Sequence, residues 1–298
     1  MVGEFADEVW QEMMKKIYEM IYPLCSHIFD FMKYLLDDTI GAAQSELDIS
    51  VDQWNESAFD LIENIVVKNV CIPIAAAFIT FIFCLELIHL LQDGNQMHNI
   101  KPQNVIFIFL KFAVCALICS KSFEIVMGFH DIGQFAVEKL GSHTVGKLME
   151  DKLSLNNLLP EIPAEYTGSL VLTLVGDMFL LLITLFVIAI MTILIRVRVM
   201  LWFLEFLIYA SAAPIPFSTF NNKEWAQVGL NYTKKMLALS FEGFFMLLMI
   251  ALYAYIVAGL NASSDFFGTL LMLLGTGIAL VVLLQKAGTI SASIFNAH

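Results

Sequence analysis

The chain has little charge and few helix-breaking residues for its length. Asp, Glu, Lys and Arg make up only 15% of its 298 residues, and it holds 7 prolines and 16 glycines, whereas 59% of the residues are hydrophobic. An average soluble domain is about 25% charged and about 45–50% apolar. Together with a mean hydropathy of +0.77, this composition excludes an ordinary soluble globular protein. It predicts an integral membrane protein.

Basic residues are scarce as well. The chain has 16 Lys and Arg against 28 Asp and Glu, which gives a formal net charge of −12. A polyanionic surface does not attract nucleic acid by counterion release, so direct DNA binding is not expected. The excess acid is concentrated in residues 1–69, which hold fourteen acidic residues against four lysines.

Motifs of catalysis and metal binding are missing. The five cysteines do not have the spacing of a disulfide framework, and there is no phosphate-binding Gly-rich loop, His-Glu-x-x-His or Gly-x-Ser-x-Gly. Cys84, Glu86 and His89 lie close together on one apolar segment, but they are too few and too weak a set for a metal site. We therefore expect no catalytic residue, no cofactor and no bound metal, and the chain is not expected to be an enzyme.

Long apolar runs are what the chain does contain. A helix needs about 20 apolar residues to cross a membrane, and five runs approach or exceed that length, whereas a sixth, Val199 to Ile215, is shorter and ends beside two prolines. We predict an all-α integral membrane protein with about five transmembrane helices plus one short re-entrant or broken helix, preceded by amphipathic N-terminal helices. The five expected crossings are residues 70–91, 105–120, 169–195, 236–260 and 266–285.

These runs divide the chain into four regions. In the N-terminal region, apolar residues recur every three or four positions from Phe5 to Leu35, and Ser50 marks the start of a second helix. These helices either lie along the membrane surface or pack on the chain's own loops, or they form an assembly surface. The expected regions are an acidic amphipathic N-terminal region (1–69), a transmembrane hairpin (70–120), an extramembrane central loop (121–168) and a C-terminal membrane domain (169–298) with a re-entrant segment (199–217).

The short segment decides the expected topology. Because prolines cannot continue a helix and the run is shorter than a crossing, we expect it to enter the membrane and turn back. In that case the basic residues on both sides of it lie on the same face as the C-terminus. The positive-inside rule then predicts a cytoplasmic C-terminus and an external N-terminus. If the segment crosses fully, the charge bias largely cancels.

Several ionisable side chains lie inside the apolar runs, where each is costly unless it is paired or hydrated. An antiparallel hairpin brings Glu86 and Lys111 to one level, which favours an ion pair over a pore-lining role. Glu205 and Glu242 have no obvious partner and are candidates for subunit contacts or a wet lumen. The full set of candidate pore, pairing or assembly residues adds Arg196, Arg198, Pro214 and Pro216.

The residues around the short segment resemble a known family. Arg196-Val197-Arg198 and the run Tyr209-Ala210-Ser211-Ala212-Ala213-Pro214-Ile215-Pro216-Phe217-Ser218-Thr219-Phe220 are similar to the signature of TrbL-like conjugal transfer proteins. The pairs Glu224-Trp225, Asn231-Tyr232 and Glu242-Gly243 resemble the version carried by integrative conjugative elements of Gram-positive bacteria.

The resemblance implies a polytopic bacterial inner-membrane component of a type IV secretion system. It implies a channel or scaffold subunit that helps to move a DNA–protein substrate across the cytoplasmic membrane as a ring of copies. The implied partners are further copies of the chain, other type IV secretion subunits, the lipid bilayer and, transiently, the translocated substrate. The residues themselves leave an alternative, a secondary transporter or accessory permease subunit, although no inverted repeat is visible.

Overall fold

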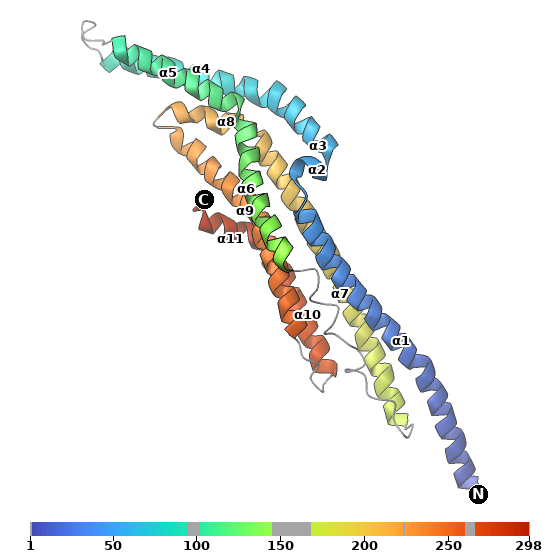
Figure 1. The fold of residues 1–298 in the computed structure, drawn as a ribbon. Helices are drawn as coiled ribbons and strands as arrows, with labels where there is room; N and C mark the ends of the chain where they lie inside the picture. The colour runs from blue at the N-terminus through green and yellow to red at the C-terminus, as the bar shows by residue number, and fades with distance from the viewer. Residues whose placement is uncertain (1, 94–101, 145–167, 223, 260–265, 298) are drawn as a thin grey trace. The chain divides into compact units, whose positions relative to one another are not determined.

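A computed structural model describes residues 2–93, 102–144, 168–222, 224–259 and 266–297 (Figure 1). Every regular element in these ranges is helical. Within them, four helical runs are long and apolar enough to cross a membrane, or five if one bent pair counts as a single span. The predicted all-α membrane fold is therefore confirmed. The candidate spans are Glu56–Gln92, Gly168–Ser211, Ala226–Val257, Phe266–Gln285 and the bent pair Val105–Ser120 with Ser122–Gly141.

The chain folds into two compact units, each assembled from three stretches of sequence. This grouping differs from the four consecutive regions expected, because helices α1 (Val2–Leu47), α7 (Gly168–Ser211) and α9 (Ala226–Gly259) each contribute residues to both units. The first unit holds residues 1–45, 141–198 and 247–285, and the second holds residues 46–140, 199–246 and 286–298.

In the first unit, α1 and α7 lie side by side (Figure 1). The Thr39 hydroxyl hydrogen-bonds to that of Thr192 at 2.8 Å, and the Arg196 guanidinium contacts the Asp38 carboxylate at 2.6 Å. The buried face of α1 includes Tyr18, Cys25, Phe29 and Met32. It differs from the apolar face that the three-to-four spacing predicts, because Met20, Leu24 and Phe31 of that repeat are exposed. Pro23 lies inside α1, which continues through it as one helix.

Helix α10 (Phe266–Gln285) packs against α7 in the same unit. Its Gly277 leaves room for the Met191 side chain, because a Cβ atom at that position would overlap the end of the methionine. Further along, the Arg198 Nε donates a hydrogen bond to the carbonyl oxygen of Leu284 at 3.2 Å. Small residues at such crossings allow helices to approach closely in membranes.

The second unit contains the remaining helices. After the short helices α2 (Val51–Trp54) and α3 (Glu56–Asp60), the π-helix η1 (Leu61–Cys71) runs directly into α4 (Ile72–Asp93). Ser50 precedes α2 as predicted, but its hydroxyl bonds to Asp52 and caps no backbone N–H. The other elements are α5 (Pro102–Ser120), α6 (Ser122–Thr144), α8 (Pro214–Phe217), the 3₁₀ turn η4 (Ser218–Asn221) and α11 (Ala287–Ile294).

The chain has no helix break at Val199, where the short apolar segment was expected to begin. Helix α7 runs without interruption for 44 residues from Gly168 to Ser211, about 66 Å at 1.5 Å per residue. Arginine is a good helix former, so Arg196 and Arg198 charge the helix without ending it. The break comes only at Ala212 and Ala213, immediately before the first proline. Membrane re-entry of residues 199–217 stays a prediction.

Helix α6 lies in the part of the chain expected to form the extramembrane central loop. It follows α5 after a bend of 59° and packs on α9 within the second unit. At the contact, a Cβ atom added to Gly133 would overlap the carbonyl oxygen of Ser240. The first part of the expected central loop is therefore a packed helix, and residues 145–167 lie outside the described ranges.

Candidate functional site

The structure brings Glu86 and Lys111 together in the hairpin of α4 and α5. The Lys111 Nζ lies 3.9 Å from the Glu86 carboxylate, and both side chains are partly exposed. Phe83 packs on the rings of Phe109 and Phe112 on the opposite helix, with centroids 5.2 and 4.7 Å apart. The aromatic contacts align the two helices, and the ion pair forms across the same interface.

The hairpin packs on the turn that contains the two prolines. Both α4 and α5 contact α8 and η4. Pro214 occupies the first turn of α8, where the missing N–H costs no hydrogen bond, and Pro216 follows within the same helix. A hydrogen bond connects the two helices across the break between α7 and α8, because the Tyr232 hydroxyl of α9 donates to the Tyr209 carbonyl oxygen of α7 at 2.7 Å. The turn is therefore a braced joint between α7 and α9 in this unit.

A groove of about 260 Å³ lies where α5 meets this turn. The Cys115 thiol at its wall is 3.6 Å from the carbonyl oxygen of Ser218. The Asn221 amide is only 2% exposed, and within the described residues neither its nitrogen nor its oxygen has a hydrogen-bond partner. With Lys111, Asn221 makes the otherwise apolar groove capable of holding a polar group.

Glu205, for which the sequence suggested no obvious partner, forms an ion pair with a lysine on another helix. Its carboxylate lies 3.9 Å from the Lys235 Nζ, which reaches it from α9, and the same ammonium lies 5.4 Å from the centroid of the Tyr209 ring. Both charged side chains are more than one-third exposed. A charge in this position is accessible to a solvent-filled space or to a partner.

Glu242 lies in the interior of the second unit. It is only 1% exposed, and its carboxylate lies against Gly288 of α11, where an added Cβ atom would be 2.9 Å from one of its oxygens. The carboxylate also interacts with other groups of the chain. Within the folded chain, therefore, Glu242 is enclosed and does not line an open surface.

The two arginines of the candidate set both hold the first unit together. Arg196 pairs with Asp38 of α1, as described above, and is 44% exposed. Arg198 is 8% exposed and bonds to the backbone of α10. Since each reaches a different helix, they fix α1 and α10 to the same part of α7.

An aromatic cluster around His130 was not singled out from the sequence. The His130 ring is 1% exposed and lies 4.8 Å from the Phe206 ring and 6.0 Å from the Trp202 ring, centroid to centroid. The Trp202 indole donates to the Leu239 carbonyl at 2.8 Å. Neither His130 nitrogen has a hydrogen-bond partner among the described residues. The spacing of Val126, His130, Gly133 and Val137, one face of a helix, is the sequence signal that indicates this burial.

These apolar helices with internal ion pairs define a multi-pass α-helical membrane protein. A family model described as TrbL/VirB6 plasmid conjugal transfer like protein matches residues 36–214. Because the match covers more than half of the chain, the chain belongs to this family, which confirms the resemblance. It is thus an inner-membrane component of conjugal transfer, the process carried out by type IV secretion systems. No curated protein matches the chain, and no solved structure does.

Proposed function

We propose that the chain is a channel or scaffold subunit that helps to move a DNA–protein substrate across the cytoplasmic membrane as a ring-forming homo-oligomer. The family match over residues 36–214 is the observation that carries this proposal. The proposed partners are other copies, the remaining type IV secretion subunits and, transiently, the substrate.

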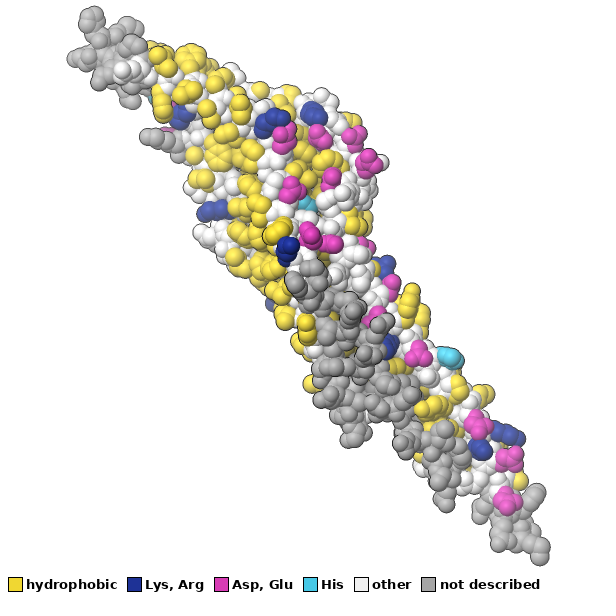
Figure 2. Space-filling model, viewed as in Figure 1, with side chains coloured by type: hydrophobic (Ala, Val, Ile, Leu, Met, Phe, Trp, Pro, Cys, Tyr) yellow, Lys and Arg dark blue, Asp and Glu magenta, His cyan; other side chains and the backbone are white. Residues whose placement is uncertain are grey.

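The surface of the hairpin is left for lipid or neighbouring subunits to cover. Only 22% of the most apolar window in the span Glu56–Gln92 is buried within the chain, whereas 61% of that in Ala226–Val257 is buried. Figure 2 shows hydrophobic side chains crowded over α4 and α5. Those exposed include Phe78, Phe81, Ile106, Phe107 and Leu110. Lipid and neighbouring subunits are the two surroundings that such a surface tolerates.

The mass of the detergent-solubilised particle tests the ring. We expect a cyclic oligomer of more than two copies, measured by light scattering or native mass spectrometry after subtraction of the detergent. A monomer at all protein concentrations would contradict the ring and favour the transporter or permease alternative.

The Glu205–Lys235 pair allows a matched test of the translocation path. If the Glu205 carboxylate lines that path, Glu205→Gln lowers conjugal transfer at least tenfold, whereas Lys235→Gln, which breaks the same pair but keeps the carboxylate, has a smaller effect. Equal losses in the two variants would show that only the ion pair matters. Normal transfer in both would remove Glu205 from the path.

The proposed topology places the N-terminus outside and the C-terminus in the cytoplasm. Glu224, which is exposed after the proline-containing turn, belongs to the cytoplasmic face in this scheme, and Ala262 to the external face. In intact cells, an impermeant thiol reagent should label Ala262→Cys but not Glu224→Cys, and permeabilisation should make the second reactive. Labelling of both before permeabilisation would refute the scheme.

A further inference from the structure

The membrane-crossing part of α7 can be located within its 44 residues. Between Asp177 and Arg196 lies an unbroken stretch of 18 residues, Met178 to Ile195, without a charged side chain. Its outward apolar side chains are well exposed within the chain, for example Phe186 at 66% and Ile193 at 61%. The length and apolar surface are those of a segment in the hydrocarbon core.

Part of α1 lies at the same level as this stretch. At one end the Asp177 carboxylate lies within electrostatic range of the Cys25 thiol. At the other end Arg196 pairs with Asp38. Residues 25–38 of α1 therefore run alongside the charge-free stretch of α7, although nothing in their own hydropathy marks them as a span.

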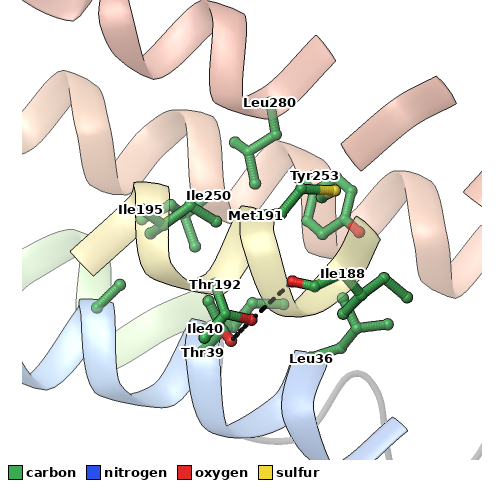
Figure 3. A pocket seen from close by; sticks show the side chains of 11 residues that line it. Leu36, Thr39, Ile40, Ile188, Met191, Thr192, Ile195, Ile250, Tyr253 and Leu280 are labelled. Atoms are coloured by element: carbon green, nitrogen blue, oxygen red, sulfur yellow. Dashed lines mark hydrogen bonds between the residues drawn. The ribbon is translucent and has the colours of Figure 1, made fainter. Parts of the chain in front are cut away.

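A small cavity in the first unit is a second observation that places α1 beside the charge-free stretch of α7. Figure 3 shows Leu36, Thr39 and Ile40 of α1 around the same cavity as side chains of three candidate spans. From α9 come Ile250 and Tyr253. The remaining labelled lining residues are Ile188, Met191, Thr192 and Ile195 from α7 and Leu280 from α10.

The exposed side of α1 at this level carries a row of polar side chains next to the exposed Phe31. His27, Asp30 and Tyr34 follow one another at steps of three and four residues, which places them along one face of the helix. We call this face the polar stripe of α1. His27 and Asp30 are exposed, and Tyr34 is 62% exposed. Figure 2 shows acidic, basic and histidine side chains along α1 on the face in view.

Lipid is unsuited to cover this face, because charged and polar side chains at the depth of the hydrocarbon core require water or polar partners. We infer that the polar stripe of α1 lines a water-filled space at membrane depth. The same stripe on a second copy is a poor alternative, since it would bring carboxylates of like charge together. The inference goes beyond the proposed function, because it requires only that α7 crosses the membrane.

Cysteine accessibility tests the inference in the full-length protein. Four native cysteines are buried and only Cys84 is exposed, so Cys84→Ala provides the background. His27→Cys and Asp30→Cys report on the polar stripe. Phe186→Cys is the matched lipid-facing control on α7. Glu12→Cys is the water-exposed control. The neighbouring Trp10 lies beside Gly168 at the beginning of α7, which is well before the charge-free stretch that starts at Met178.

A hydrophilic thiol reagent is applied to membranes, and the reaction rate is measured for each variant that inserts in normal amount. Only a hydrated thiol ionises and reacts. We expect both stripe positions to react within about tenfold of Glu12→Cys, and Phe186→Cys at least about 100-fold more slowly. Stripe positions as slow as Phe186→Cys would overturn the inference. Conjugal transfer plays no part in this readout, so the inference and the proposed function can fail separately.

Discussion

The contact between α6 and α9 provides a sharp test of the packing in the second unit. Gly133 and Gly128 are both in α6, but a Cβ atom at Gly133 overlaps the Ser240 carbonyl oxygen, whereas one at Gly128 meets nothing within 4 Å. Neither glycine has a positive φ, so alanine fits the backbone conformation at both positions. The two variants Gly133→Ala and Gly128→Ala therefore differ only in the space around the added methyl group.

The expected magnitudes have opposite signs. Replacing glycine by alanine within a helix contributes about 1 kcal/mol of stability at either position. At Gly133 the new methyl group meets backbone, which cannot rotate away, so the overpacking cost should lie near the upper end of the usual range, about 3 kcal/mol. The net loss of about 2 kcal/mol corresponds to a melting temperature lower by about 4–8 °C. Gly128→Ala should raise it by about 2–4 °C.

Thermal unfolding in detergent, followed by the loss of helical circular dichroism or by aggregation, gives the two melting temperatures. Wild-type protein in the same detergent is the reference. If Gly133→Ala is as stable as Gly128→Ala, α6 and α9 do not approach each other as closely as the structure has them, and the packing of the second unit is incorrect.

Three further predictions concern the first unit. Gly277→Ala should cost clearly less in melting temperature than Gly133→Ala, because its Cβ meets only the flexible end of a methionine; an equal loss would contradict this. Asp38→Asn should lower stability by less than about 1 kcal/mol, since the Arg196–Asp38 pair is partly exposed, and the swap Asp38→Arg with Arg196→Asp should recover part of the loss, as a double-mutant cycle would show. Tyr253→Phe should leave the melting temperature unchanged or higher, because the buried hydroxyl has no hydrogen-bond partner in the described residues; a marked decrease would instead indicate a water molecule in the adjoining cavity.

Hydropathy was sufficient to predict the fold class and the approximate positions of the spans. Apolar runs of membrane length must form helices, because the bilayer offers no other partner to the backbone. Hydropathy was not sufficient to locate the end of α7. Arg196 and Arg198 look like a boundary in a hydropathy profile, yet arginine favours helix and both side chains find partners on other helices.

Some contacts of the candidate site could be predicted from the sequence and others could not. Glu86 and Lys111 meet in a hairpin of neighbouring spans, so their relative level follows from the chain order. The partner of Glu205 could not be found in this way, because Lys235 reaches it from a helix that begins after the turn. For His130, the helical spacing indicates burial, but the aromatic rings around it come from α7 and could not be inferred from that spacing.

The sequence by itself determined that the chain is an all-helical, multi-pass membrane protein, and the residues around its proline-containing turn indicated the TrbL-like family. These properties depend on local composition, which the bilayer and the backbone translate directly into helices. Only the tertiary structure decided which charges are paired and which helices share a level. It placed the acidic α1, which hydropathy assigns to no span, beside the most apolar part of α7. Contacts between residues more than 150 positions apart carry that information, and no local pattern contains it.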